Sequence, residues 1–477
     1  MAALAVVLVN AHVLTMSPDR PDARALAIVD GRVAYVGDDA AQAKKIAGPK
    51  AEVIDARGRT VVPGFNDAHA HFGLSITLGS DHGIDLPDGL TKKAFVDAVE
   101  RASAERPDDR FLYVKIRELP DGVRRARDLD FVKRPVFVVT SHGGVLNHAG
   151  VKRGAFTDEE APQGFIRGRE LAAALDRIVR LLPLGVLEAG ARQFLDHLAH
   201  AGITSVQLID ELPDLFEHLR RDGQLTARVR MIPLGYRFET PVYHSEWTGP
   251  APEWVRVEGV KYFHDEGARI TRYELGEIFA ENVPAHRQIV VHVLSKHALD
   301  TLLDGIEQLA QQAKQPDATR DFRLEHVDEC TPEQAARLAK DGIIVCENPS
   351  MIPEWKSEHA FPLRTLEDAG VRTCIGTDFV GAHEPPRPIE PMKSIALASA
   401  RPGDERVPVA RALAAYTVGS AAAEHMSSVK GSLTVGKFAD LVILSADPTK
   451  VTLDRLADVD PLLTMVAGQV VFRSPRF

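Results

Sequence analysis

The chain has 477 residues, of which 45% are apolar and 26% charged, and its net charge is -10. This is the composition of a folded globular protein, and the length predicts one large domain with a smaller one beside it. The negative charge, without a basic stripe, disfavours nucleic acid and anionic membranes as partners and favours a small-molecule substrate. A homo-oligomer is a common state for soluble proteins of this kind, and we keep it as an expectation.

The three cysteines, an odd number without C-x-x-C spacing, predict neither a disulfide framework nor a thiolate zinc site. The apolar run at residues 4–9 has no basic leader and is too short to span a bilayer. No later segment offers about 18 uninterrupted apolar residues. We therefore expect a cytoplasmic protein without a membrane partner.

Short β-rich runs separated by turns fill the first sixty residues, at 6–9, 25–29, 33–36 and 51–54, with a hairpin turn at Asp30-Gly31. Short β-rich runs separated by turns occur again only near the end of the chain, at residues 439–444 and 464–471. We predict that residues 1–60 and 427–477 together form one small β-sheet domain.

Between these segments, strands alternate with long helical patterns, as βα units do. The clearest helices, with apolar residues at spacings of three and four, are 187–201, 298–314, 332–341 and 409–424. The strand candidates are 60–63, 111–114, 135–139, 203–208, 229–233, 257–263, 289–293, 322–326, 343–346 and 373–376. These ten exceed the eight strands of a (β/α) barrel, so one or two of them must lie outside it.

The most telling residues are His69 and His71, which follow an apolar strand signal at residues 61–65. In a strand, side chains two apart point to the same face, whereas in a helix they diverge. Both imidazoles can therefore reach one metal ion. The alternative is a pair of exposed histidines at a strand end.

Further polar residues end or follow apolar runs, and they are Lys261, His264, His292, His326 and Asp378. In a parallel barrel the catalytic side chains lie at the carboxyl ends of the strands, so these residues are expected to meet. Each one alone has an ordinary structural explanation. Together with the first two histidines, the imidazoles and the carboxylate match the nitrogen and oxygen ligands of zinc, cobalt or manganese.

Lys261 lies within an apolar run, where burial lowers the pKa of an amine and leaves it neutral. A neutral amine can react with carbon dioxide to give a carbamate, whose two oxygens could bridge a pair of metal ions. The alternative is an unmodified lysine beside a single metal ion.

Taken together, these motifs resemble the metal-dependent amidohydrolase superfamily, in the family 3 branch that includes N-substituted formamide deformylases. The resemblance covers nearly the whole chain. Its most specific parts are Val62-Pro63-Gly64-Phe65 leading to His69-Ala70-His71, and Gly431-Ser432-Leu433-Thr434-Val435-Gly436-Lys437-Phe438-Ala439-Asp440-Leu441-Val442. It implies a distorted (β/α)8 TIM barrel over residues 61–426 and a β-sandwich built from both chain termini.

The resemblance also implies the roles of the site residues. His69 and His71 would bind one metal ion, His292 and His326 a second, and Asp378 would contact the first ion and act as the base. One or two divalent ions per chain are expected, zinc first, with cobalt, manganese or iron as alternatives. The implied reaction is hydrolysis of a non-peptide carbon–nitrogen bond in an amide, formamide, urea or carbamate, by water activated on the metal.

His142, with Asn147 nearby, also resembles the branch, and its ring could stabilise the oxyanion of the substrate. The alternative is a loop histidine that caps backbone groups.

Other interpretations stay open. A mononuclear aminohydrolase that deaminates a heterocycle usually has His-x-x-Glu at the strand that contains His292 here. Ser295 lies at the position of that Glu. This favours an amide-type bond over ring deamination. His297 could replace His292 as a ligand, although we expect it to begin a helix. An inactive scaffold with the same fold would lack a ligand, and every expected ligand type is present here.

Overall fold

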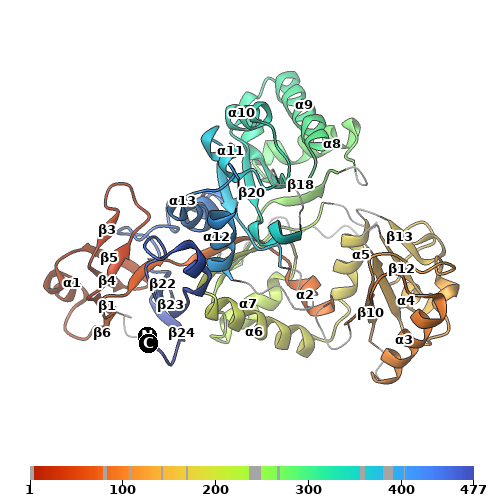
Figure 1. Ribbon diagram of the computed structural model, residues 1–477, viewed down its shortest axis with the longest axis horizontal. Coiled ribbons are helices and arrows are strands. Elements are labelled where there is room, and N and C mark those ends of the chain that lie inside the picture. Colours follow the sequence, from red (N-terminus) through yellow and green to blue (C-terminus); the bar gives the residue numbers. More distant parts are fainter. Residues whose placement is uncertain are drawn as a thin grey trace.

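The structure is a computed structural model (Figure 1) that describes residues 5–78, 83–106, 110–140, 143–167, 170–235, 249–265, 269–354, 360–379, 390–401 and 403–477. Figure 1 shows three parts side by side: strands from both chain ends on the left, a central α/β region, and a separate sheet on the right.

Two sheets lie on the left, and the larger one combines strands from both chain ends. A four-stranded sheet has the order β5-β4-β1-β6, with bounds Arg32–Gly37, Ala25–Val29, Ala5–Val9 and Glu52–Asp55. A six-stranded sheet has the order β24-β23-β22-β7-β2-β3, with bounds Gln469–Arg473, Pro461–Val466, Leu441–Leu444, Thr60–Pro63, His12–Leu14 and Asp22–Ala23. β7 runs antiparallel to β22, so Pro63 lies opposite Leu441. One hydrophobic cluster joins the two sheets, because it contains Val6 and Leu26 as well as Leu441 and Met465.

Two parallel sheets form the centre. The first has the order β16-β15-β14-β8, with bounds Val255–Val257, Arg228–Met231, Ile203–Leu208 and Phe65–Ala70. The second has the order β17-β18-β19-β20-β21, with bounds Val260–Phe263, Ile289–Val293, Phe322–His326, Ile344–Glu347 and Arg372–Ile375. Isolated parallel bridges join their edges, between Ala70 and Phe379 and between Leu234 and Lys261. The result is a TIM-barrel-like α/β fold, in which the carboxyl ends of the strands face the same side.

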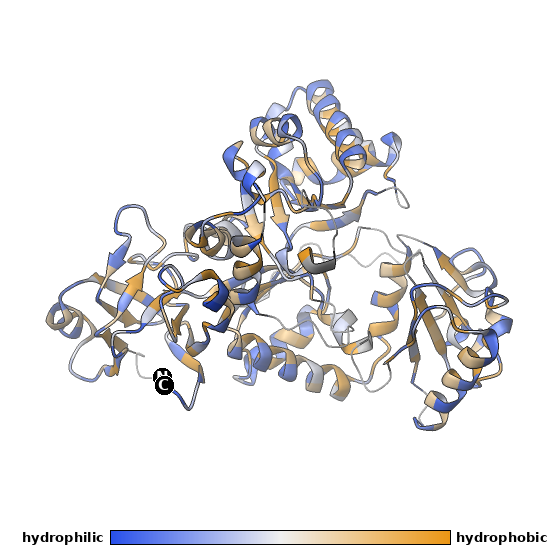
Figure 2. Cartoon of the chain, in the orientation of Figure 1, coloured by the Kyte–Doolittle hydropathy of each residue, from blue (hydrophilic) through white to orange (hydrophobic). Residues whose placement is uncertain are grey.

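Helices follow the central strands, and their bounds are α5 (Glu170–Val179), α6 (Leu184–His200), α7 (Pro213–Arg221), α8 (Arg272–Asn282), α9 (Lys296–Ala313), α10 (Pro332–Asp341), α11 (Leu363–Asp368), α12 (Pro391–Ala400), α13 (Val409–Ala414) and α14 (Ser420–Ala423). The four predicted helices are confirmed, although the last is divided by a π-helical segment, Ala415–Gly419. α10 begins at a capping box of Thr331 and Gln334 and ends at Gly342 in the left-handed conformation. Figure 2 shows mainly apolar strands and helices of mixed hydropathy around them, as expected for helices that cover a sheet.

A third sheet is inserted between α2 (Phe72–Leu78) and α5, on the right in Figure 1. Its order is β13-β12-β11-β10-β9, with bounds Phe165–Arg167, Gly143–Leu146, Val136–Thr140, Leu112–Lys115 and Gly83–Asp85. Its helices include α3 (Lys92–Ala104) and α4 (His148–Arg153). The strand candidates at residues 111–114 and 135–139 belong to this sheet, and the candidate at 60–63 belongs to the six-stranded sheet. Three of the ten candidates therefore lie outside the two central sheets, and not the expected one or two.

The first central strand, β8, was not among the predicted strands. Residues 60–63 were predicted as a strand, and they form β7 of the six-stranded terminal sheet. β8 reads Phe-Asn-Asp-Ala-His-Ala and is buried along its whole length. Buried polar side chains interrupt the apolar pattern of this strand, so hydrophobic periodicity cannot reveal it.

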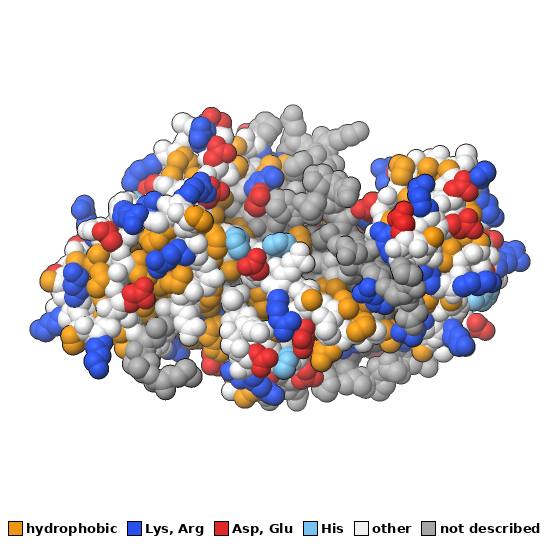
Figure 3. Space-filling model, turned by 90° about the horizontal axis from the view of Figure 1, so that it is seen from below, with side chains coloured by type: hydrophobic (Ala, Val, Ile, Leu, Met, Phe, Trp, Pro, Cys, Tyr) orange, Lys and Arg blue, Asp and Glu red, His pale blue; other side chains and the backbone are white. Residues whose placement is uncertain are grey.

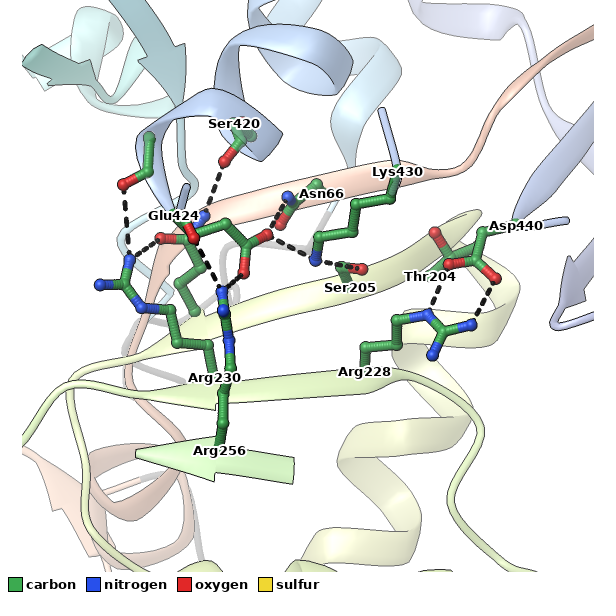
Figure 4. A network of polar contacts seen from close by, with 12 residues as sticks. Asn66, Thr204, Ser205, Arg228, Arg230, Arg256, Ser420, Glu424, Lys430 and Asp440 are labelled. Carbon is green, nitrogen blue, oxygen red and sulfur yellow. Dashed lines mark hydrogen bonds and ion pairs between the residues drawn. The ribbon is translucent and has the colours of Figure 1, made fainter. Parts of the chain in front are cut away.

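A buried polar network ties the central strands to the C-terminal segment (Figure 4). Arg228 on β15 donates to both carboxylate oxygens of Asp440, at 2.7 and 3.2 Å. Nearby, Glu424 accepts from Asn66 at 2.6 Å and pairs with Lys430 and Arg256. Asp440 belongs to the motif at residues 431–442, so this motif joins the terminal sheets to the barrel-like centre.

Charged side chains of both signs are interspersed over the described part of the face shown in Figure 3, and none of that part is given over to one sign. Among the helices that the structure describes, none is long and apolar enough to cross a bilayer.

Candidate metal centre

Three of the predicted ligands converge at the end of β8. His69 lies in the strand and is 1% exposed, and His71 lies just beyond the strand end. Their Nε2 atoms are 3.2 Å apart. Oδ1 of Asp378 lies 3.5 Å from Nε2 of His69 and 3.2 Å from Nε2 of His71. One ligand atom from each of the three residues falls within 4.8 Å of the others, which is a spacing suited to a shared cation.

The chain approaches this point because of a glycine and a carboxylate. A Cβ on Gly376 would lie 2.5 Å from the backbone nitrogen of His69, so only glycine lets the segment after β21 pass β8 so closely. Asp67 accepts hydrogen bonds from the backbone of Thr377 at 2.9 Å, from its hydroxyl at 2.7 Å and from the backbone of His69 at 3.2 Å. These contacts hold Asp378 beside the two histidines.

A second pair of imidazoles lies next to the first. His292 is in β18 and His326 ends β19, and their ring centroids are 4.5 Å apart. The ring of His326 lies 5.1 Å from that of His69. His326 and Asp378 both have positive φ, 72° and 49°, a strained backbone that clusters at functional sites.

Lys261 lies in β17, 1% exposed, with an Nζ that has no hydrogen-bond partner in the described part of the chain. Burial lowers its pKa to about 8. Its charge acts on His69, His292 and His326, so its amine lies near these three imidazoles. A buried amine without a partner is costly unless it is neutral, modified or paired with an anion.

The electrostatics favour neutral rings for His69, His292 and His326 and an ionised Asp378, the protonation states that metal binding requires. Burial and the nearby Lys261 lower the pKa of His69 to about 4. Burial lowers the pKa of His326 to about 3 and that of His292 well below its usual value. Burial raises the pKa of Asp378, but a hydrogen bond from His71 and the other neighbouring histidines outweigh it, so the net pKa is lowered.

Glu325 is a site residue that the sequence analysis missed. Its carboxylate is fully buried and accepts a hydrogen bond from Nδ1 of His69, while Nε of Arg323 lies 2.6 Å from its other oxygen. A carboxylate on Nδ1 fixes the tautomer of His69 and leaves Nε2 bare for a metal. The available signal was the alternation in Arg323-Leu324-Glu325, where two charged residues sit in an otherwise apolar strand.

Other candidate residues have structural roles. His264 contacts Thr301 at 2.9 Å and accepts from the backbone of Ile270 at 3.1 Å. His297 is exposed near the start of α9, as expected, and Ser295 caps that helix by accepting from Ala298 at 3.2 Å.

Asn147 donates to the carbonyls of Val132 and Arg134, at 3.1 and 2.8 Å, and so is used within the inserted sheet region. His142 lies outside the described residues.

The donor set fits a divalent metal ion. Imidazole nitrogens and a carboxylate converge, whereas the buried Cys346 and Cys374 lie in a separate apolar cluster with Ala68. A parallel α/β barrel-like fold with this site at its strand ends is typical of metal-dependent hydrolases. More particularly, residues 52–472 match the model of the amidohydrolase family, and the chain belongs to that family.

Similar proteins agree with this assignment. The chain is 26% identical to N-substituted formamide deformylase from Arthrobacter pascens, with 97% of each chain covered. An uncharacterized metal-dependent hydrolase from Pyrococcus furiosus has a similar structure, with a TM-score of 0.69, 23% identity, and coverage of 94% of this chain and 100% of that one. An adenosine deaminase from Xanthomonas campestris with bound zinc gives a TM-score of 0.61 at 16% identity, covering 99% of this chain and 93% of that one.

Proposed function

We propose that the enzyme hydrolyses an amide, formamide, urea or carbamate bond of a small molecule, using one or two divalent metal ions held by the residues of the candidate metal centre. The observation that carries this proposal is the convergence of His69, His71 and Asp378 within 4.8 Å. The similarity to a formamide deformylase over 97% of both chains supports the bond class.

In this proposal, His69, His71 and Asp378 would hold one ion, and His292 and His326 would hold a second. The Lys261 amine, after reaction with carbon dioxide to a carbamate and loss of a proton, would supply oxygen ligands beside them, which its burial and its lack of a partner support. Zinc is the first expectation, because the similar adenosine deaminase contains it, and cobalt, manganese and iron are alternatives.

When bound, the metal supplies Lewis acidity, which makes water a nucleophile near neutral pH and polarises the substrate carbonyl. Glu325 keeps the ring of His69 oriented for this role. Asp378 accepts the proton of the attacking water at its carboxylate and returns it to the leaving nitrogen. Its lowered pKa keeps the carboxylate ionised at neutral pH. His142 is proposed to stabilise the oxyanion.

We also propose the finer architecture: a distorted (β/α)8 barrel over residues 61–426 and a β-sandwich from residues 1–60 and 427–477. The two edge bridges of the central sheets and the hydrophobic cluster shared by the terminal sheets support it. A cytoplasmic location is supported by free Cys330, Cys346 and Cys374. A homo-oligomer stays a prediction.

The second candidate function is deamination of a heterocycle, which the fold of the zinc-containing adenosine deaminase favours. Ser295, which caps α9, lies at the position where deaminases of this superfamily carry a Glu that transfers protons. The absence of that Glu is the reason why deamination is only the second candidate. Release of ammonia with retention of the carbon skeleton would select deamination.

The test is metal content per chain, measured by mass spectrometry on protein purified without chelator. We expect nearly two ions in the wild type, and one or none in Lys261→Ala. His264→Asn, which alters a buried histidine with ordinary hydrogen bonds, is the control and should keep the wild-type content. The loaded enzyme should then release amine from a panel of formamides, amides and ureas. One ion in both the wild type and Lys261→Ala would refute the bridge, and no bound metal at all would refute the proposed function.

A further inference from the structure

The backbone directly after β8, the strand that carries His69, is held by hydrogen bonds from two neighbouring segments. His71 lies beyond the end of β8, where the strand ladder no longer holds it. Its own N–H donates to the carbonyl of Phe379 at 3.0 Å. The next two N–H groups, of Phe72 and Gly73, donate to the carboxylate of Asp210, at 2.7 Å to Oδ2 and 3.0 Å to Oδ1. Three consecutive N–H groups are therefore bound, two of them by one side chain.

Asp210 comes from the neighbouring strand and is itself held in place. It follows the end of β14 by two residues and is 8% exposed. The residue before it, Ile209, donates to the carbonyl of Ala70 at 2.9 Å, which fixes the end of β14 against the end of β8. The carboxylate thus accepts from the first N–H groups of α2, which have no acceptor within the helix.

The absence of a side chain at Gly73 lets the carboxylate of Asp210 approach the start of α2. A Cβ at this position would lie 2.5 Å from Oδ1 of Asp210 and 3.3 Å from a methyl group of Val179. Gly73 is helical and does not have a positive φ, so its backbone conformation suits alanine equally well. The close approach of the carboxylate, and not the backbone conformation, demands glycine here.

We propose that Asp210 is a positioning residue for His71. By binding the two N–H groups that follow, it sets the direction in which the chain leaves β8, so that Nε2 of His71 faces Nε2 of His69 and Oδ1 of Asp378. Gly73 leaves room for that carboxylate. This inference rests on the proposed metal-dependent function, because it concerns the ligand that His71 supplies.

The test measures Co²⁺ binding to metal-free protein by visible absorption, with unfolding in urea recorded in parallel. The variants are Asp210→Ala, Asp210→Asn, Gly73→Ala and the double variant Gly73→Ala with Asp210→Ala. Gly276→Ala is the matched control, since nothing lies within 4 Å of a Cβ at that helical glycine.

We expect Asp210→Ala to weaken Co²⁺ binding about 10- to 100-fold and to alter the spectrum, since residues that orient a ligand typically contribute that much. Gly73→Ala should weaken binding as well, because it displaces the carboxylate. Asp210→Asn, which keeps one acceptor oxygen, should have a smaller effect. The double variant should bind no more weakly than Asp210→Ala alone, since the carboxylate that Gly73→Ala displaces is already absent from it. Gly276→Ala should bind as the wild type does.

Several results would overturn the inference. If the losses of the two single variants multiply in the double variant, the two residues act independently. If Co²⁺ affinity and spectrum are unchanged in Asp210→Ala and Gly73→Ala while the urea midpoint falls, Asp210 has only a structural role. Should Asp210→Ala fail to fold, Asp210→Asn and Gly73→Ala decide between these outcomes by the same two readouts. Wild-type protein that binds no Co²⁺ would instead refute the proposed function.

Discussion

Asp440→Ala is expected to destabilise the protein strongly, because Asp440 is the counterion of a buried arginine. Asp440 is 6% exposed and Arg228 is 4% exposed. Two hydrogen bonds join their side chains, at 2.7 and 3.2 Å, and Asp440 also accepts from the backbone of Ala467 at 2.8 Å. Removing the carboxylate leaves a buried guanidinium without its partner.

The magnitude follows from these contacts. Breaking a buried ion pair by removing one partner costs about 3–5 kcal/mol. The backbone N–H of Ala467, which loses its acceptor when Asp440 is replaced, adds a cost of about 1 kcal/mol. Against this, Arg228 keeps a hydrogen bond to the carbonyl of Glu253 at 2.8 Å and lies 3.7 Å from the ring centroid of Phe438. Such cation–π contacts offset about 0.5–2 kcal/mol, so we expect a net loss of about 2–5.5 kcal/mol in the free energy of unfolding.

Urea unfolding followed by tryptophan fluorescence measures this loss, because Trp254 lies 4.6 Å from the guanidinium of Arg228. The control is Asp317→Ala, whose ion pair with Arg320 is formed by side chains that are 79% and 65% exposed, and which should change the free energy by less than about 1 kcal/mol. Replacing Arg228 and Asp440 together by leucine should cost less than Asp440→Ala. The reasoning is refuted if Asp440→Ala costs no more than the surface control.

The remaining predictions concern the site and the effect of pH. Glu325→Gln should lower metal affinity about 10- to 100-fold, measured by Co²⁺ titration, because the amide holds the ring of His69 less firmly than the carboxylate does; unchanged affinity would contradict this. Gly376→Ala should abolish metal binding while the helical circular dichroism is retained, since its Cβ would lie 2.5 Å from the nitrogen of His69; a metal content equal to that of the wild type would contradict the close approach. Burial raises the pKa of Glu424, but Lys430 and nearby arginines outweigh it and set this pKa at about 2, below its usual 4.5. The stability that this ionised group contributes is present above pH 4.5 and is lost as the pH falls toward 2. The stability of the wild type relative to Glu424→Gln, measured by urea unfolding at several pH values, should therefore shrink over that range, and a constant difference would contradict the assignment.

The candidate metal ligands could be selected from the sequence because they follow a local pattern, and their role as ligands stays a prediction. His292 and His326 stand out as polar residues at the ends of apolar runs, and the i, i+2 spacing of His69 and His71 is visible without any tertiary contact. The structure brings these residues together with Lys261 and Asp378, as the topology of parallel strands requires.

What the sequence could not reveal depends on contacts between distant segments. Asp67 and Glu325 look like ordinary strand residues until β8, β19 and the segment after β21 are placed side by side. The inserted sheet was missed as a unit because its strands have the same apolar pattern as the central strands. Nothing in the local pattern of residues 111–114 or 135–139 says which sheet a strand joins.

The pairing of β7 with β22 has a consequence for how the protein is made. The partner of Thr60–Pro63 is Leu441–Leu444, which leaves the ribosome about 380 residues later, or roughly 20 to 75 s at ordinary rates of translation. During that interval the N-terminal strands have one open edge, which invites pairing with other chains. The six-stranded sheet, which combines strands from both ends of the chain, can be completed only when synthesis is nearly finished. A nascent chain that stalls before residue 441 therefore cannot finish folding its first sixty residues.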